Sequence, residues 1–201
     1  AKTLAERLPD VDWYAALEAV CLKTLDALRE GEPVRKLEDA PKLEKMNWRL
    51  EPVLFDGHPN LIYGPGGIGK SLIAIYFAHL VALPHAHNGF TPEPGQVLYL
   101  DWEFSSAETR SRADEVLKGI MGVEGSPVYY RFCHQPLQAD IEQINRIVVE
   151  LDIKMLIVDS AAPACGGNPE SAEATLQFFG ALRSLHGITS LIIAHEAKNS
   201  T

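Results

Sequence analysis

Cysteine is scarce in this sequence, with three residues in 201. They stand far apart, at Cys21, Cys133 and Cys165, and no C-x-x-C pair occurs. This spacing argues against a disulfide framework and is typical of a reducing compartment. The longest apolar run, from Leu72 to Leu83, is too short to cross a bilayer. Because the N-terminus also lacks the apolar region of a signal peptide, we expect a soluble, cytoplasmic protein.

Basic residues are also few, with 18 lysines and arginines against 27 acidic residues and a formal net charge of −9. A chain with this field does not bind nucleic acid through its overall charge, so such a role would need a local basic loop or an assembled channel. The length of 201 residues and the hydrophobic content of 46% predict one globular domain with an appendage.

One glycine-rich stretch, Gly64-Pro65-Gly66-Gly67-Ile68-Gly69-Lys70-Ser71, matches the phosphate-binding pattern G-x-x-x-x-G-K-S/T. Glycines there let successive backbone N–H groups turn inward as an anion nest at the N-terminus of a helix. Lys70 would then reach the β- and γ-phosphates of a nucleotide, and the Ser71 hydroxyl would bind Mg²⁺. The nucleotide-binding residues predicted in this stretch are Gly64, Pro65, Gly66, Gly67, Ile68, Gly69, Lys70, Ser71 and Leu72.

The flanking sequence supports this interpretation, because strand, glycine loop and helix follow one another in the required order. Residues 60–63 are predicted to form a short buried strand, and residues 71–83 a buried helix that stops at Pro84. The alternative is a glycine-rich turn in front of an ordinary core helix.

Two further apolar segments end in acidic residues. Residues 96–103 are predicted to form a buried strand that ends with Asp101 and Glu103. Ligands of open α/β sheets bind outside the carboxyl ends of the strands, where a carboxylate opposite the phosphate loop could activate a water molecule. The alternative is a pair of solvated acids. Residues 155–160 form the Walker B pattern, four apolar residues and then Asp159, which predicts a carboxylate for Mg²⁺.

The segment after the second strand carries a helix start and two arginines. Ser105 or Ser106, together with Glu108, predicts a helix whose first turns contain Arg110 and Arg112. An arginine at this place could stack on an adenine ring, or both could be ordinary surface residues.

The end of the sequence predicts a loop, a helix and a last strand. Small and polar residues at 161–172 predict a mobile loop, and the helix after it has Leu176 on its apolar face. The strand at 188–194 then delivers His195 and Lys198 to the edge where the acids lie. A hydrogen-bonded structural histidine is the alternative for His195.

The first 47 residues differ in character from the rest. Asp12 can cap a helix, because apolar residues recur at helical spacing as far as Leu28. Residues 32–47 are charged and contain prolines, as a linker does. The apolar stripe of the helix would pack either on the chain's own core or on a neighbouring subunit. We therefore divide the chain into an N-terminal helical arm, 1–47, and a core, 48–201.

Four of these elements together resemble the RecA-like ATPases: the loop 64–71, the strand end Asp101-Trp102-Glu103, residues 157–160, and Ala194-His195-Glu196-Ala197-Lys198. The sequence looks most like the RepA-type and DnaB-type hexameric replicative helicases and their phage or plasmid relatives, over residues 48–198. The resemblance implies an α/β fold, a RecA-like P-loop three-layer sandwich with a mostly parallel central sheet. It also implies Mg²⁺-dependent ATP hydrolysis by a homo-oligomer, a hexameric ring or a filament, that acts on single-stranded DNA or another single-stranded nucleic acid.

The resemblance also implies roles for individual residues, with the phosphate and Mg²⁺ ligands predicted above keeping theirs. Glu103 looks like the catalytic glutamate, and His195 is similar to the residue that senses the γ-phosphate. Lys198 resembles a basic group offered across a subunit interface. Arg112, and less closely Arg110, is similar to an arginine beside the adenine.

The sequence departs from the family in two respects. RepA-type members often carry two histidines where this chain has His195 and Glu196. RecA-like cores usually add further strands, whereas this chain ends at Thr201, so a core truncated at its C-terminal end is one expectation.

Two other functions stay open. A P-loop kinase for a small molecule would need an arginine-rich lid over the acceptor, and Arg131, Arg146 and Arg183 are isolated in the sequence. A nucleotide-switched assembly or regulatory protein that does not move along DNA is compatible with the negative net charge.

Overall fold

The computed structural model describes residues 8–30, 34–42, 45–83, 85–168, 171–185 and 187–196. They fall into two compact units, divided between residues 44 and 45. Across the described residues, no helix has both the length and the apolar character needed to cross a membrane.

The described residues of the first unit include the α-helix α2 (Trp13–Glu30) and a short 3₁₀ turn, η1 (Leu37–Asp39). Asp12 caps α2 as predicted, because its Oδ1 accepts hydrogen bonds from the N–H groups of Tyr14 and Ala15, both at 3.1 Å. The predicted apolar stripe is present but exposed, with most of its members open to solvent: Val11, Tyr14, Leu17, Val20 and Leu25.

The second unit is built on a central sheet of five parallel strands, in the order β3-β8-β7-β5-β6. The strands are β3 (Pro59–Gly64), β5 (Gln96–Asp101), β6 (Tyr129–Phe132), β7 (Ile153–Asp159) and β8 (Thr189–His195). β7 lies in the middle and, apart from Lys154, all of its residues are buried, as expected of a parallel strand covered on both faces.

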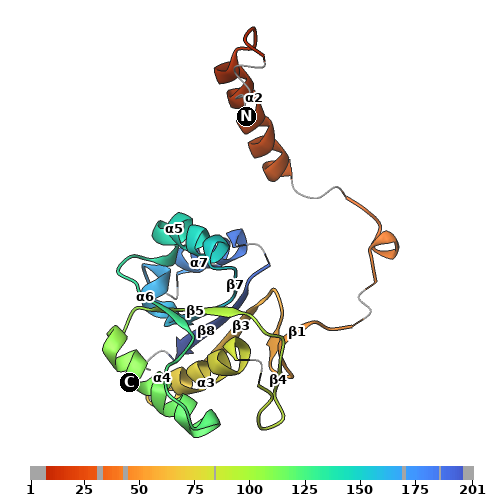
Figure 1. The fold of residues 1–201 in the computed structure, drawn as a ribbon. Helices are drawn as coiled ribbons and strands as arrows, with labels where there is room; N and C mark the ends of the chain where they lie inside the picture. Colours follow the sequence, from red (N-terminus) through yellow and green to blue (C-terminus); the bar gives the residue numbers. More distant parts are fainter. Residues whose placement is uncertain are drawn as a thin grey trace. The chain divides into compact units, whose positions relative to one another are not determined.

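Helices cover both faces of this sheet, which confirms the predicted three-layer α/β fold (Figure 1). α3 and α4 cover one face, where Leu80 of α3 belongs to the same core cluster as Tyr99 and Ile157 of the sheet. α5, α6 and α7 cover the other face, whose core cluster includes Leu100 and Leu156 of the sheet. The helices are α3 (Lys70–Ala82), α4 (Ser106–Met121), α5 (Leu137–Glu150), α6 (Ala161–Cys165) and α7 (Ala172–Ser184).

The start of α4 follows the sequence signal closely. Ser105 is the N-cap, and its hydroxyl and the Glu108 side chain form a reciprocal capping box. Gly122 ends the helix in the left-handed region, with φ of 70°. The capping box fixes where the chain turns from β5 into α4, and so it fixes the position of the residues in that turn.

A second, small antiparallel sheet was not predicted. It has the order β2-β1-β4, with β1 (Trp48–Glu51), β2 (Leu54–Phe55) and β4 (Thr91–Pro92). These strands are only two to four residues long, too short for their sequence to show an alternating pattern. The sheet exists because long-range contacts hold the short strands in place.

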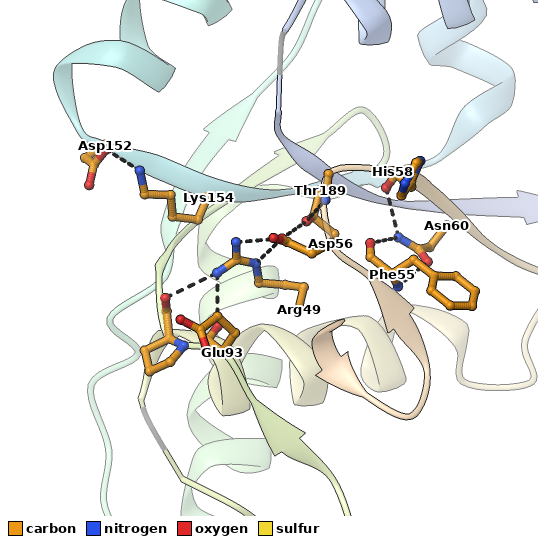
Figure 2. A network of polar contacts seen from close by, with 11 residues as sticks. Arg49, Phe55, Asp56, His58, Asn60, Glu93, Asp152, Lys154 and Thr189 are labelled. Carbon is orange, nitrogen blue, oxygen red and sulfur yellow. Dashed lines mark hydrogen bonds and ion pairs between the residues drawn. The ribbon is translucent and has the colours of Figure 1, made fainter. Parts of the chain in front are cut away.

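A buried arginine joins the small sheet to the main one (Figure 2). The Arg49 side chain is 8% exposed, and its Nε and Nη2 donate to Asp56 Oδ1 at 2.9 and 2.6 Å. Its Nη1 donates to the carbonyl oxygens of Glu93 and Pro94 at 3.1 and 3.2 Å. Thr189, the first residue of β8, donates to the same Asp56 oxygen at 2.8 Å. One guanidinium therefore links β1, the segment before β5 and the start of β8.

Two predictions for the segment after β7 are wrong. Residues 161–165 form the short helix α6 instead of a mobile loop, because Pro163 lies in its first turn, where a proline is tolerated. Gly166 ends α6 with φ of 73°, and a Cβ there would clash with the Pro136 side chain. In α7 the buried face contains Phe178 and Leu182, whereas Leu176 is 71% exposed.

Candidate nucleotide and magnesium site

The carboxyl ends of the parallel strands bring the predicted site residues to one edge of the sheet. Gly64, the last residue of β3, pairs with His195 of β8, and Asp101 of β5 pairs with Asp159 of β7. β8 lies between the phosphate-loop strand and the Walker B strand. This order places His195 between the two groups of residues, a neighbourhood that the linear sequence does not show.

The glycine loop leads directly into α3. Gly67 and Gly69 have φ of 75° and 90°, left-handed values that glycine adopts without strain. Gly69 is the N-cap of α3, so the loop opens onto a helix N-terminus that favours anions. Ile68 and Leu72 are largely exposed, at 59% and 46%. The loop has the backbone geometry that a phosphate-binding nest requires.

The Lys70 ammonium is buried within the loop, since the residue is 4% exposed. Its Nζ donates to the carbonyl oxygens of Gly64 at 2.9 Å and Pro65 at 2.6 Å, and it lies 3.1 Å from His195 Nδ1. An ammonium has no acceptor, so Nδ1 accepts this bond, and a neutral His195 then carries its proton on Nε2. Bound phosphate oxygens could replace these three neutral acceptors.

Glu103 lies opposite the loop, two residues beyond the end of β5. Its Oε1 is 3.8 Å from His195 Nε2 and accepts a hydrogen bond from Ser160 Oγ at 2.5 Å. The Glu103 side chain is 34% exposed, whereas Ser160 is fully buried. A continuous row of polar contacts therefore runs from Lys70 through His195 and Glu103 to Ser160.

Asp101 has a different environment from Glu103, although both acids follow the same strand. Asp101 is fully buried, and its Oδ1 accepts from the N–H groups of Glu103 and Phe104 at 2.9 and 3.0 Å. Its Oδ2 accepts from Thr109 Oγ1 at 2.8 Å, and the Tyr130 hydroxyl lies 3.5 Å from the same oxygen while it donates to the Phe104 carbonyl oxygen at 2.7 Å. Asp101 is therefore not a solvated acid; it holds the turn that presents Glu103.

The two carboxylate oxygens of Asp159 differ in their hydrogen bonding within the described residues. Its Oδ2 accepts from the Tyr99 hydroxyl at 2.5 Å, and its Oδ1 is buried without a hydrogen-bond partner among the described residues. Burial raises the pKa of Asp159, while the hydroxyls of Tyr99 and Ser71 act to lower it. Mg²⁺ prefers oxygen ligands such as carboxylates and hydroxyls. The Ser71 hydroxyl and the Asp159 carboxylate could therefore hold Mg²⁺, partly through water.

Two supporting residues were not predicted from the sequence. Tyr99 is 3% exposed and stands in an apolar strand, where the sequence marks it only as a core residue. Ser160 follows the Walker B acid directly, which is the sole signal in the sequence that it lies at the site. Their roles as donors to Asp159 and Glu103 depend on contacts between strands that are far apart in the chain.

The basic residues predicted for the site have other surroundings. The Arg112 guanidinium lies 3.9 Å from the centre of the Phe104 ring, so it stacks on a neighbouring side chain. Arg110 is largely exposed and pairs with Asp114 at 3.5 Å. Lys198 lies outside the described residues. Among the described residues, the cation nearest the phosphate loop is therefore Lys70 itself.

Comparison with known families agrees with this geometry. The model of a family described as an AAA domain matches residues 24–201, and the chain belongs to this family of P-loop ATPases. A search of curated proteins returned no match. The family and the fold together define a P-loop nucleotide-binding protein with a five-stranded parallel sheet.

Proposed function

We propose that this protein binds ATP with Mg²⁺ at the carboxyl edge of its sheet and hydrolyses the γ-phosphate. The observation that carries the proposal is the row of contacts from Lys70 to His195 and Glu103, beside the unpaired oxygen of Asp159. Lys70 and the loop amides would hold the phosphates, and Ser71 with Asp159 would hold the metal ion. Glu103, which is partly open to solvent, would orient and activate the attacking water.

His195 gives the site a means of reporting what is bound. In the structure it contacts both the lysine that would bind the phosphates and the acid that would activate water. When phosphate draws Lys70 away, His195 loses the partner of its Nδ1. A change at the end of β8 would then reach the residues that follow this strand.

The finer proposal is a RecA-like motor of the RepA or DnaB type, cytoplasmic and acting on single-stranded DNA as a ring or filament. In this proposal residues 1–47 form an arm beside a core of residues 48–201. A neighbouring subunit completes the site with a cation, for which Lys198 is our candidate. A cation supplied in this way, the arginine finger of other P-loop enzymes, raises rates about 10³–10⁵-fold. The protein as a monomer should therefore hydrolyse ATP slowly.

A second candidate is a nucleotide-switched assembly or regulatory ATPase that does not travel along DNA. The formal net charge of −9 favours it, since a track-binding surface would have to be built locally against that field. Both candidates share the same nucleotide site and differ in what the nucleotide state controls.

The first test is phosphate release by wild-type protein and by Glu103→Gln at saturating MgATP. We expect free phosphate as the product and a loss of about 10²–10⁴-fold in the variant, the usual contribution of a general base. Undiminished turnover by Glu103→Gln would remove Glu103 from this role. Transfer of the phosphate to an added small alcohol or amine would indicate a kinase instead.

The second test separates the two candidates. Fluorescence anisotropy of labelled single-stranded DNA would be followed with and without a non-hydrolysable ATP analogue, over a range of salt concentrations. Chain size would be measured in the same mixtures. ATP-dependent DNA binding by the assembled protein supports the motor, and assembly without DNA binding supports the regulatory ATPase.

A further inference from the structure

The face of the sheet covered by α3 and α4 contains a cavity of about 350 Å³. Its walls include Ile75, Ala78 and His79 of α3, Tyr99 of β5, Ala113 of α4 and Tyr130 of β6. The hollow opens to solvent beside Ser106 and Arg110, so it is a surface pocket and not an enclosed void. A hollow of this size, with mainly apolar walls, falls in the range of small-molecule sites.

The lining is suited to an uncharged ligand. His79 is 1% exposed, burial lowers its pKa, and its Nε2 lies 2.9 Å from Ser126 Oγ. The imidazole is therefore neutral near pH 7. Arg110 is the one lining residue with a permanent charge, and it is largely exposed and paired with Asp114. No unpaired charge among these described lining residues would attract an ion.

The walls also favour a flat ligand. The rings of Tyr99 and Tyr130 stack on each other, with their centroids 6.4 Å apart and 20° between their planes, and the small side chains of Ala78 and Ala113 line the hollow beside them. Aromatic faces of this kind stack on other rings. We propose that this cavity binds a small, uncharged aromatic or heteroaromatic molecule, with the hydroxyl and imidazole groups of the lining bonding to the polar edge of its ring.

Three residues that line the cavity also contact the buried acids at the nucleotide site. The Tyr99 hydroxyl donates to Asp159 at 2.5 Å, the Thr109 hydroxyl donates to Asp101 Oδ2 at 2.8 Å, and the Tyr130 hydroxyl lies 3.5 Å from that oxygen. A ligand that moves either tyrosine ring therefore changes the environment of an acid at the strand ends. The cavity would act as a regulatory site, and by linkage bound nucleotide would change the ligand's affinity by the same factor. This coupling rests on the proposed nucleotide site, whereas binding in the cavity does not.

The test uses 1-N-phenylnaphthylamine, an uncharged aromatic dye whose fluorescence rises in apolar surroundings, titrated into the full chain. Ala113→Leu adds bulk inside the cavity, and Ala107→Leu adds the same side chain to an exposed position of the same helix, as a matched control. We expect saturable binding to wild type and the control, and at least a tenfold weaker affinity for Ala113→Leu. Equal affinity in a folded Ala113→Leu protein would overturn the proposal.

Thermal melting shows whether Ala113→Leu has folded; if it has not, Ala78→Val, a smaller change in the opposite wall, takes its place. A second titration adds MgATP analogue. A several-fold change in dye affinity, lost in the cavity variant, supports the regulatory coupling, and no change contradicts it. One-for-one displacement of dye by nucleotide would show that the cavity is part of the nucleotide site and would end the proposal. If nucleotide does not bind at all, the proposed function fails while the dye titration still decides the cavity.

Discussion

The Ser160 hydroxyl is the most direct test of how the proposed catalytic acid is held. Ser160 is fully buried, and its Oγ donates to Glu103 Oε1 at 2.5 Å. Ser160→Ala removes this donor and leaves the backbone and the volume nearly unchanged. Glu103 would then keep its contact with His195 Nε2, 3.8 Å away.

The expected magnitude follows from the strength of one charge-assisted hydrogen bond. Such bonds contribute about 1.5–3 kcal/mol, which corresponds to roughly 10- to 150-fold in rate. The Glu103 side chain is 34% exposed, so water can replace part of the lost bond. We therefore expect kcat for ATP hydrolysis to fall about tenfold, the lower end of that range, with little change in the affinity for nucleotide.

A double-mutant cycle with Glu103→Gln gives the decisive measurement. If Ser160 acts by positioning Glu103, Ser160→Ala should change the residual turnover of the Glu103→Gln protein by less than about twofold. Phosphate release at saturating MgATP and nucleotide binding by fluorescence would be measured for all four proteins. A wild-type kcat in Ser160→Ala, or the same loss in both backgrounds, would refute the positioning role.

Three further outcomes are expected from substitutions elsewhere. Lys70→Ala should weaken ATP binding about 10- to 100-fold, because it removes a charged group that would contact phosphate. The control Lys118→Ala, at an exposed position, should leave the affinity unchanged, and calorimetric titration measures both. Burial raises the pKa of Asp159 in the folded state, so this group contributes stability at low pH. The contribution is lost as the pH rises through that raised pKa. At pH 7 without metal, Asp159→Asn should therefore raise Tm by about 2–4 °C, with the difference shrinking toward pH 4, and Mg²⁺-dependent turnover should disappear. Arg49→Ala breaks the buried link to Asp56 and should destabilise the fold by about 3–5 kcal/mol in urea denaturation, whereas Lys154→Ala, at an exposed ion pair, should change it by less than about 0.5 kcal/mol.

Local signals were sufficient where neighbouring residues in the chain decide the structure. The glycine loop, the capping box at Ser105 and the cap at Asp12 each depend on residues within a few positions of one another. The apolar strands before Asp101 and Asp159 were also clear, since a buried parallel strand leaves a continuous apolar run. The part of the predicted loop at residues 161–165 was wrong, because Pro163 and Gly166 are as compatible with a short helix and its end as with a loop.

The sequence by itself determined the phosphate loop, the strands that end at Asp101, Asp159 and His195, and the family of P-loop ATPases, because short sequence patterns mark each of them. Only the tertiary structure decided which of the two acids is accessible to solvent and which is buried and holds the turn. Asp101 and Glu103 are two residues apart, but the first is enclosed by Thr109 and Tyr130 and the second faces His195 and Ser160. The tertiary structure also decided the cavity beside Tyr99. Strand order and the packing of helices on the sheet set both features, and neither is encoded by residues adjacent in the chain.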